Sequence, residues 1–267
     1  MSITLPTERV QAKDYNPKLL VIIGLPKSGK TTWAASIDDN LILDTEDGTR
    51  GVDALSVQVR TYADFFDVAK QLKEYKDANG KFRYRRVTID NATKLEEITL
   101  PLAAAMYRAT PQGANWEILK DGNNRPLKDA KGNPLYNQNA DIRTLPNGAG
   151  YMWTRKALTK VINGFKDLCE TLILICHVKD KQIQRNGMEL SEVSINLAGK
   201  TGDIVCSDAD GVAYCYREDK NTYLSFQGGD NIIRGSRCAH LSNKLFTIIT
   251  SDKDNNITCN WKDIILD

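Results

Sequence analysis

The sequence predicts an α/β fold, with a mainly parallel central sheet flanked by helices. Short apolar runs alternate with segments of helical periodicity, and a glycine-rich loop joins the first such run to the first helix. Strands that are connected through helices run parallel. The most apolar run, TLILIC at 171–176, has no polar alternation, which is typical of a central strand buried on both faces.

The first half of the chain supplies three expected strands and three expected helices. The strands are expected at 19–23, 41–44 and 86–90, and the helices at 30–37, 61–75 and 92–107. The helix at 61–75 is the clearest of these, because Phe65, Val68 and Leu72 recur at helical spacing. Each strand is followed by a helix, as a parallel sheet requires.

The second half is less regular. Residues 108–150 are rich in Gly, Asn, Asp and Pro and are expected to form an irregular insertion, which in a compact domain is usually functional or disordered. Apolar residues recur at helical spacing over 151–169, ahead of the strand at 171–176. A second long polar connection follows that strand. We find no internal repeat.

The C-terminal part is predicted to be antiparallel. The runs 211–217 and 222–226 flank EDKN and resemble a hairpin, and the DNN turn in the tail indicates another hairpin or an edge strand. We expect one domain over 1–267, with a core at about 17–217, the insertion at about 108–150, and a β extension at about 218–267.

Composition limits the functional classes. The net charge is +2, from 36 basic and 34 acidic residues, so bulk charge does not make the molecule a nucleic-acid-binding polycation and any such site must be local. No run approaches the ~20 apolar residues of a membrane span, and the polar start does not resemble a secretion signal. The six cysteines form no CxxC pair, and Cys176, Cys206 and Cys215 lie in strand-like runs, so reduced buried thiols in a cytoplasmic protein are expected.

The segment GLPKSGKT, Gly24 to Thr31, is the strongest motif in the chain. It follows an apolar strand and precedes a helix, which is the context of a phosphate-binding P-loop. Glycines let backbone N–H groups and the helix N-terminus turn toward a polyphosphate. Lys30 is expected to reach the β- and γ-phosphates, and the Thr31 hydroxyl to bind Mg²⁺. The predicted nucleotide-binding residues are Gly24, Leu25, Pro26, Lys27, Ser28, Gly29, Lys30, Thr31 and Thr32.

Three further strand ends carry polar side chains suited to hydrolysis. Asp90 ends the strand 86–90 and is predicted to orient Mg²⁺ together with Thr31, or else to cap the following helix. Glu46, in DTEDG, is the predicted general base for water, with Asp44 and Asp47 as competitors. His177 follows TLILIC at the same edge and either senses the γ-phosphate or only ends the strand.

This arrangement resembles the RecA-type ATPase core. More narrowly, the blocks GLPKSGKTT, LILDTEDGT, RVTIDNATKL, ILICHVKDK and LAGKTGDIVCSDADGVAY resemble phage-encoded RecA-like nucleotide-binding proteins, some of which are single-strand annealing recombinases. The resemblance covers most of 19–217 and implies a RecA-like P-loop NTPase that uses ATP and Mg²⁺. It also implies Glu46 as general base and His177 as the residue that couples nucleotide state to a DNA-binding loop. Glutamine is usual there in the family, so histidine is a departure.

The same resemblance implies where single-stranded DNA would bind. In RecA-like filaments, loops after the magnesium-binding strand and after the sensor strand line the DNA path, and both polar stretches of this chain fall at those places. Basic residues neutralise phosphates and aromatic residues stack on bases; in a solvated loop they would do neither. The predicted contacts are Trp116, Lys120, Arg125, Lys128, Arg143, Tyr151, Arg155, Lys179, Lys181 and Arg185.

A homo-oligomer, as a ring or a filament, is also implied, because ATP sites in this superfamily lie between subunits. Lys200 and Arg217 are the candidate basic fingers donated to a neighbour, with DNA contact or plain surface charge as alternatives. A single-strand-binding protein is a further possible partner, and the location implied is the cytoplasm of a bacterial host.

Three other functions remain open at this point. The same motifs suit a motor for replication or packaging, a small-molecule phosphotransferase, or a nucleotide-gated binding module without useful turnover. No arginine-rich lid is evident for a phosphotransferase, although Arg83, Arg85 and Arg86 precede the Asp90 strand.

Overall fold

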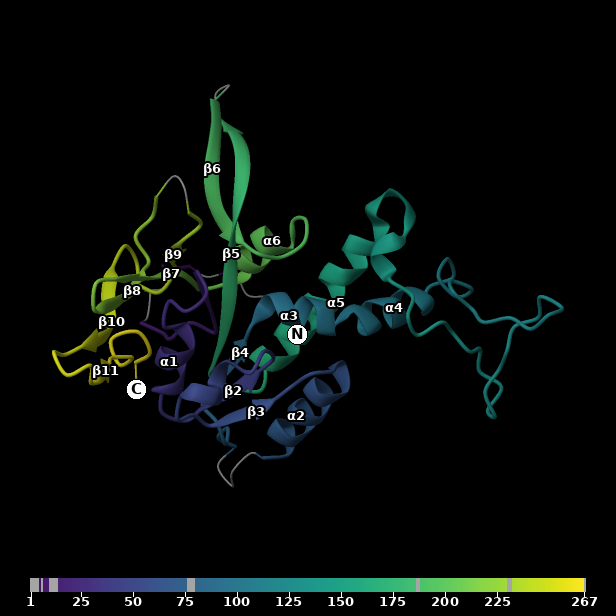
Figure 1. Ribbon diagram of the computed structural model, residues 1–267, viewed down its shortest axis with the longest axis horizontal. Helices are drawn as coiled ribbons and strands as arrows, with labels where there is room; N and C mark the ends of the chain where they lie inside the picture. The colour runs from purple at the N-terminus through teal and green to yellow at the C-terminus, as the bar shows by residue number, and fades with distance from the viewer. Residues whose placement is uncertain are drawn as a thin grey trace.

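The structure is a computed structural model that describes residues 5, 7–9, 14–75, 80–185, 188–229 and 232–266. Four strands of the parallel part of the sheet precede the insertion, and two more follow it (Figure 1). The elements up to the insertion are β1 (Leu19–Gly24), α1 (Lys30–Ala35), β2 (Asn40–Asp44), β3 (Ser56–Gln58), α2 (Tyr62–Glu74), β4 (Arg86–Asp90), α3 (Ala92–Ile98) and α4 (Leu100–Arg108). The later elements are α5 (Ala149–Lys166), β5 (Thr171–Arg185), β6 (Met188–Ile195), α6 (Thr201–Asp208), β7 (Gly211–Glu218), β8 (Asn221–Ser225), β9 (Gly235–Ser236), β10 (Leu245–Ser251) and β11 (Ile257–Cys259).

One sheet contains all the strands of the described chain, in the order β11-β10-β8-β7-β1-β5-β4-β2-β3, with β6 on β5 and β9 on β7. The pairs from β7 to β3 are parallel, and those from β7 to β11 are antiparallel. The predicted α/β architecture is therefore confirmed, with a mainly parallel central sheet, flanking helices and C-terminal hairpin strands. Strand β5 lies between β1 and β4, which brings the ends of all three together.

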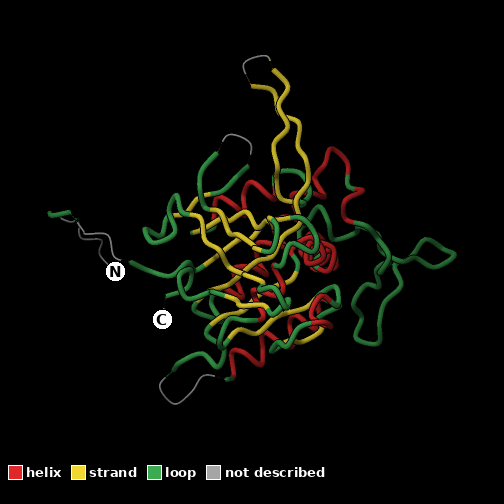
Figure 2. Tube along the Cα trace, turned by 60° about the vertical axis from the view of Figure 1, so that its left-hand side comes forward, coloured by secondary structure: helices red, strands yellow, loops and turns green. Residues whose placement is uncertain are grey.

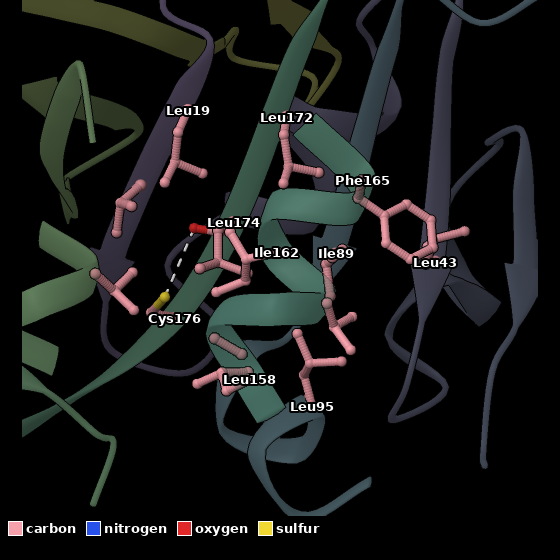
Figure 3. Packing of buried hydrophobic residues seen from close by; sticks show 14 of the residues in the cluster. Leu19, Leu43, Ile89, Leu95, Leu158, Ile162, Phe165, Leu172, Leu174 and Cys176 are labelled. Atoms are coloured by element: carbon pink, nitrogen blue, oxygen red, sulfur yellow. Dashed lines mark hydrogen bonds between the residues drawn. The ribbon is translucent and has the colours of Figure 1, made fainter. Parts of the chain in front are cut away.

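The central strands are buried on both faces, and alternate residues enter two different clusters. Leu19, Leu172 and Leu174 face the helices α2, α3, α5 and α6 (Figure 3). Leu20, Ile22 and their neighbours pack instead on Trp33 of α1 and on the C-terminal strands. Side chains of successive strand residues point to opposite faces, so a run with no polar alternation requires a cover on each side.

Two of the expected elements differ from the structure. The single helix expected at 92–107 is two helices, because Pro101 in the first turn of α4 has no N–H to continue the backbone ladder and the chain turns at Thr99. Cys206 lies in helix α6 rather than in a strand-like run, and its thiol is buried. Strands β3 and β9 and helix α6 were not predicted.

The sequence predicted an irregular polar connection after residue 176. In the structure this segment is a β-hairpin. β5 continues past the sheet to Arg185 and pairs antiparallel with β6 from Val178↔Ile195 to Arg185↔Met188. This hairpin projects from the body of the molecule (Figure 2). Backbone hydrogen bonds along both strands make it a structured extension of the sheet rather than a loop.

Residues 117–137, called the arm below, form a second projection, which leaves the ends of α4 and α5 (Figure 1). It contains a repeat that we did not find in the sequence: Leu119-Lys120-Asp121 and Pro126 recur eight residues later as Leu127-Lys128-Asp129 and Pro134. Each aspartate Oδ1 accepts two backbone N–H bonds in its own turn, at 2.8–2.9 Å. Leu119, Leu127 and Leu135 close a ring in which each N–H donates to the carbonyl of another member. The arm is thus built from two copies of one turn.

Among the helices of the described chain, none combines the length and the apolar character that crossing a membrane requires.

Candidate functional site

The P-loop curls tightly between β1 and α1. Lys27 and Gly29 adopt positive φ values of 63° and 95°, so the backbone N–H groups of the loop turn inward as in an anion-binding nest. Gly24 is required by close approach, because a Cβ at this position would lie 2.4 Å from the carbonyl oxygen of Cys215 on β7. The predicted nucleotide-binding loop therefore has the backbone shape that a polyphosphate needs.

Lys30 is folded back onto its own loop. Its Nζ donates to the carbonyls of Gly24 and Leu25, at 3.1 and 2.6 Å, and to Ser28 Oγ at 3.2 Å. Burial lowers the pKa of this ammonium group, and the nearby Cys215 and Asp90 act against that shift. A phosphate would replace the neutral carbonyl partners of this ammonium group with a charged partner. Because the ammonium group is desolvated, its interaction with the phosphate would be strongly favourable.

Thr31 and Asp90 meet at the centre of the cavity. Thr31 Oγ1 donates to Asp90 Oδ2 at 2.6 Å. Burial raises the pKa of the Asp90 carboxyl, and the hydrogen bond from Thr31 acts against that shift. A hydroxyl and a carboxylate beside a phosphate loop fit Mg²⁺, which takes one or two protein oxygens and completes its shell with phosphates and water. The two predicted metal ligands are therefore adjacent.

The competitors of Glu46 in DTEDG have other roles. Asp44 is buried, which opposes its ionisation, yet hydrogen bonds from Thr49, the Glu46 N–H and Gln58 lower its pKa overall. It lines the cavity, but its two carboxylate oxygens accept hydrogen bonds that organise the turn. Asp47 pairs with Arg60 at 2.5 Å and with Arg50 at 3.7 Å.

Glu46, Asn91 and His177 form a small network at the edge of the cavity. Asn91 Nδ2 donates to Glu46 Oε2 at 2.6 Å and lies 3.0 Å from His177 Nε2. Asn91 Oδ1 accepts the N–H of Lys94 as the N-cap of α3, which fixes the orientation of the amide and turns its N–H groups toward Glu46 and His177. The sequence analysis missed Asn91, because next to a helix it has the pattern of an ordinary cap.

The network continues into the base of the hairpin. His177 is the β5 residue opposite Gly24 of β1, and its carbonyl accepts the N–H of Asn196, which follows β6. The Asn196 carbonyl in turn accepts the Thr93 hydroxyl of α3 at 2.9 Å. The predicted base and sensor are therefore joined to each other and to the start of the hairpin.

The cavity that holds these residues has a volume of about 690 Å³ and is also lined by the C-terminal strands. Arg217, Thr222, Ile249 and Ile257 belong to its wall. Of the two predicted fingers, Arg217 thus lies at the cavity of its own chain, whereas Lys200 is exposed at the start of α6 and is not part of this wall.

The predicted DNA contacts fall into two groups. Lys120, Arg125 and Lys128 are exposed on the arm, and their side chains make no hydrogen bond or ion pair within the described part of the chain. The neighbouring carboxylates Asp121 and Asp129 are also exposed, and the Oδ1 of each accepts backbone N–H groups of its own turn.

Three of the seven remaining predicted contacts are engaged with the protein itself. Trp116 packs edge-on against Tyr107 and under Arg108 at the base of the arm. Arg143 is held in a forked ion pair by Asp141, and Lys179 donates to the Leu197 carbonyl. Tyr151 is exposed at the start of α5 and Arg155 is half-buried on the same helix, while the side chains of Lys181 and Arg185 lie outside the described residues.

Comparison with known proteins gives one family match and one structural likeness. Residues 16–119, under half of the chain, match the family model of an AAA domain. Among solved structures, the crystal structure of the RadB recombinase has a TM-score of 0.43 and 13% sequence identity, covering 91% of each chain. No curated protein matches the sequence. The fold and the site together define an α/β protein with a P-loop and a polar cavity at one edge of a mainly parallel sheet.

Proposed function

We propose that the protein is an ATPase that binds single-stranded DNA as a homo-oligomer and serves phage DNA recombination by strand annealing. The observation that carries the proposal is the convergence of the P-loop Lys30 and Thr31 with Asp90 and Glu46 in one cavity. Four groups in this arrangement supply what phosphoryl transfer to water needs: charge neutralisation, a metal position and a base.

In the proposed reaction, Glu46 takes a proton from a water molecule as the water oxygen attacks the γ-phosphorus. The bond from that phosphorus to the β–γ bridging oxygen breaks, and ADP and inorganic phosphate leave. Thr31 and Asp90 would hold Mg²⁺, which would supply charge neutralisation on the phosphates. Lys30 moves from the loop carbonyls to the phosphate oxygens, and Asn91 holds the carboxylate of Glu46 in place.

DNA binding is proposed for the arm and the hairpin, the two projections of the body (Figure 2). Lys120, Arg125 and Lys128, whose side chains have no ion pair among the described residues, support a phosphate contact, since each neutralised phosphate releases counterions. Support for coupling to ATP comes from the bonds that join His177, at the base of the hairpin, to Asn91 and Asn196.

The test is ATP hydrolysis by the purified protein with and without single-stranded DNA, with Lys30→Ala as the blank. We expect turnover that depends on Lys30 and rises severalfold with single strands. Turnover that is indifferent to DNA, or unwinding of duplexes during turnover, would contradict the annealing proposal and favour a phosphotransferase or a motor. Nucleotide binding without turnover in the wild type would favour a gated binding module.

A further inference from the structure

One face of the C-terminal strands forms a wall of the cavity that contains the P-loop. Its residues lie in register: Arg217 of β7 is opposite Thr222 of β8, which is opposite Ile249 of β10. Ser251 of β10 is opposite Ile257 of β11. Residues directly opposite each other share a face of a sheet, so these side chains form one wall. All five line the cavity.

The sheet order decides which end of a nucleotide meets this wall. Glu46 and Asp90 come from the ends of β2 and β4, on one side of β1, and the C-terminal strands lie on the other side. For hydrolysis, the γ-phosphate must lie near Glu46, the proposed general base, and near the proposed Mg²⁺ ligand Asp90. The nucleoside therefore leaves the P-loop in the opposite direction, toward β8, β10 and β11.

The wall has the chemistry of a nucleobase site. Ile249 supports the loop, since a Cβ at Gly29 would lie 3.1 Å from its Cδ1, and Ile257 is 58% exposed beside it. An exposed isoleucine over a polar cavity offers an apolar surface to a flat ring. Arg217 is exposed and has no ion pair within the described residues, so its charge is available to a phosphate or ribose.

Asn255 supplies the polar contact that such a site needs for selectivity. It lies in the turn between β10 and β11 with φ 64°, where Asp252 Oδ1 accepts the N–H groups of Asp254 and Asn256 at 2.8 Å. Lys220 Nζ donates to the Asp252 carbonyl and ties the turn to the β7–β8 connection. Asn255 lines the cavity, and its side chain makes no hydrogen bond within the described residues. The turn is thus held rigidly while its amide is unused.

We propose that the β10–β11 hairpin is the nucleobase subsite and that Asn255 selects adenine over guanine. An asparagine amide offers one donor and one acceptor side by side, which matches N7 and the N6 amino group of adenine. Guanine has two acceptors at the corresponding edge, N7 and O6, and leaves the amide oxygen opposite another oxygen. The inference rests on the proposed ATP-binding function and specifies its substrate.

The arm provides a matched control, because it contains the same turn. Asn124 lies three residues after Asp121, as Asn255 lies three after Asp252, and has φ 62°. Gly132 holds that position in the second copy, with φ 85°, so glycine fits the turn. Asn255→Gly therefore removes the amide without strain, and Asn124→Gly makes the same change far from the cavity.

The experiment measures binding of the magnesium complexes of AMPPNP and GMPPNP by isothermal titration calorimetry. For the wild type and Asn124→Gly we expect AMPPNP to bind roughly tenfold more tightly than GMPPNP, the discrimination typical of one two-bond base contact. In Asn255→Gly the ratio is expected to fall to about twofold or less. Ile257→Ser should weaken both analogues alike, and Lys30→Ala should weaken both strongly.

Two results overturn the inference and leave the proposed function in place: no base preference in the wild type, or an unchanged preference in Asn255→Gly, each with binding that depends on Lys30. If the wild type binds neither analogue, or if Lys30→Ala binds both as the wild type does, the proposed function and the base subsite both fall.

Discussion

The hairpin β5–β6 and the arm both project from the body, but they are attached to it in different ways (Figure 2). The hairpin is the direct continuation of a central strand, and its first residues include His177 at the nucleotide cavity. The arm is anchored on α4 and α5 by Arg108, whose guanidinium lies over Trp116 and Tyr136. Hydrogen bonds through Asn91, His177 and Asn196 join the Glu46 side of the cavity to the hairpin, and among the described residues no such series of bonds leads to the arm. We therefore expect the hairpin to respond to the bound nucleotide and the arm to be independent of it.

Removing the proposed base gives the largest effect and tests the hairpin side of this comparison. Glu46→Gln should lower single-turnover ATP hydrolysis by about 100-fold or more, since it removes general-base catalysis. Nucleotide binding should be retained, because the P-loop is unchanged. The control is Asp47→Asn, one residue further on, whose carboxylate pairs with Arg60 and which should hydrolyse ATP at close to the wild-type rate. Equal loss in both variants would mean that the turn, and not the Glu46 carboxylate, is needed.

Removing positive charge from the arm tests the expectation that the arm binds DNA independently of nucleotide. Lys120→Ala combined with Lys128→Ala should weaken single-stranded DNA binding about tenfold at low salt and reduce the salt slope by about 1.4, at ~0.7 per lost phosphate contact. The factor should be the same with and without AMPPNP. Lys70→Ala combined with Lys73→Ala on α2 removes two exposed cations elsewhere and should leave the affinity unchanged. An arm effect that appears only with nucleotide would remove the distinction between the two projections.

A smaller effect is expected from removing the contacts of Asn91 that join Glu46 to His177 at the base of the hairpin. Serine caps helices about as well as asparagine but is too short to reach both Glu46 and His177, so Asn91→Ser should keep α3 and lose the bridge. We expect the ratio of DNA affinities with and without AMPPNP to fall about threefold, a coupling loss at the low end of the usual range. Fluorescence anisotropy with labelled single strands measures this ratio. An unchanged ratio at unchanged thermal stability would show that coupling bypasses Asn91.

The smallest effect concerns stability and pH. Burial raises the pKa of Asp90, so between its ordinary and its raised pKa the folded protein binds more protons than the unfolded chain, and stability falls as pH rises through that window. Once Asp90 is ionised, its buried charge destabilises the nucleotide-free protein. Asp90→Asn should therefore raise the Tm of the nucleotide-free protein by a few degrees at neutral pH, and thermal unfolding scans with and without ATP and Mg²⁺ measure this. The variant should lose the stabilisation that ATP with Mg²⁺ gives the wild type. A lower Tm would mean that the hydrogen bond from Thr31 outweighs the burial cost.

The parallel core could be predicted from sequence because each of its strands is a short apolar run followed by a helix pattern. The P-loop, Asp90 and Glu46 follow the carboxyl ends of those runs. The parallel order alone therefore predicted that they lie close together at one edge of the sheet. Thr31 and Asp90 lie within 2.6 Å of each other in the structure. Local pattern and tertiary packing agree in this part of the chain.

The hairpin, the arm repeat and the role of Asn91 could not be predicted from the sequence, for physical reasons. The hairpin strand HVKDKQIQR has no apolar face, because it leaves the core, and so it lacks the alternation by which strands are recognised. The arm repeat keeps only leucine, lysine, aspartate and proline, and its order comes from carboxylate-to-backbone bonds that periodicity does not report. Asn91 could have been singled out only by knowing that Glu46 and His177 both lie beside it.

The two ends of the arm, Glu117 and Asn137, are bonded to each other, which has a consequence for changes in the length of the arm. Asn137 bonds back to Glu117 through both its backbone N–H and its side chain, at 2.9 and 3.1 Å. Everything between them starts and ends at one point on the surface, so eight-residue units can be gained, lost or replaced without moving α4 or α5. The arm is thus a modular appendage, and its tips are natural positions for a fluorophore or an affinity tag.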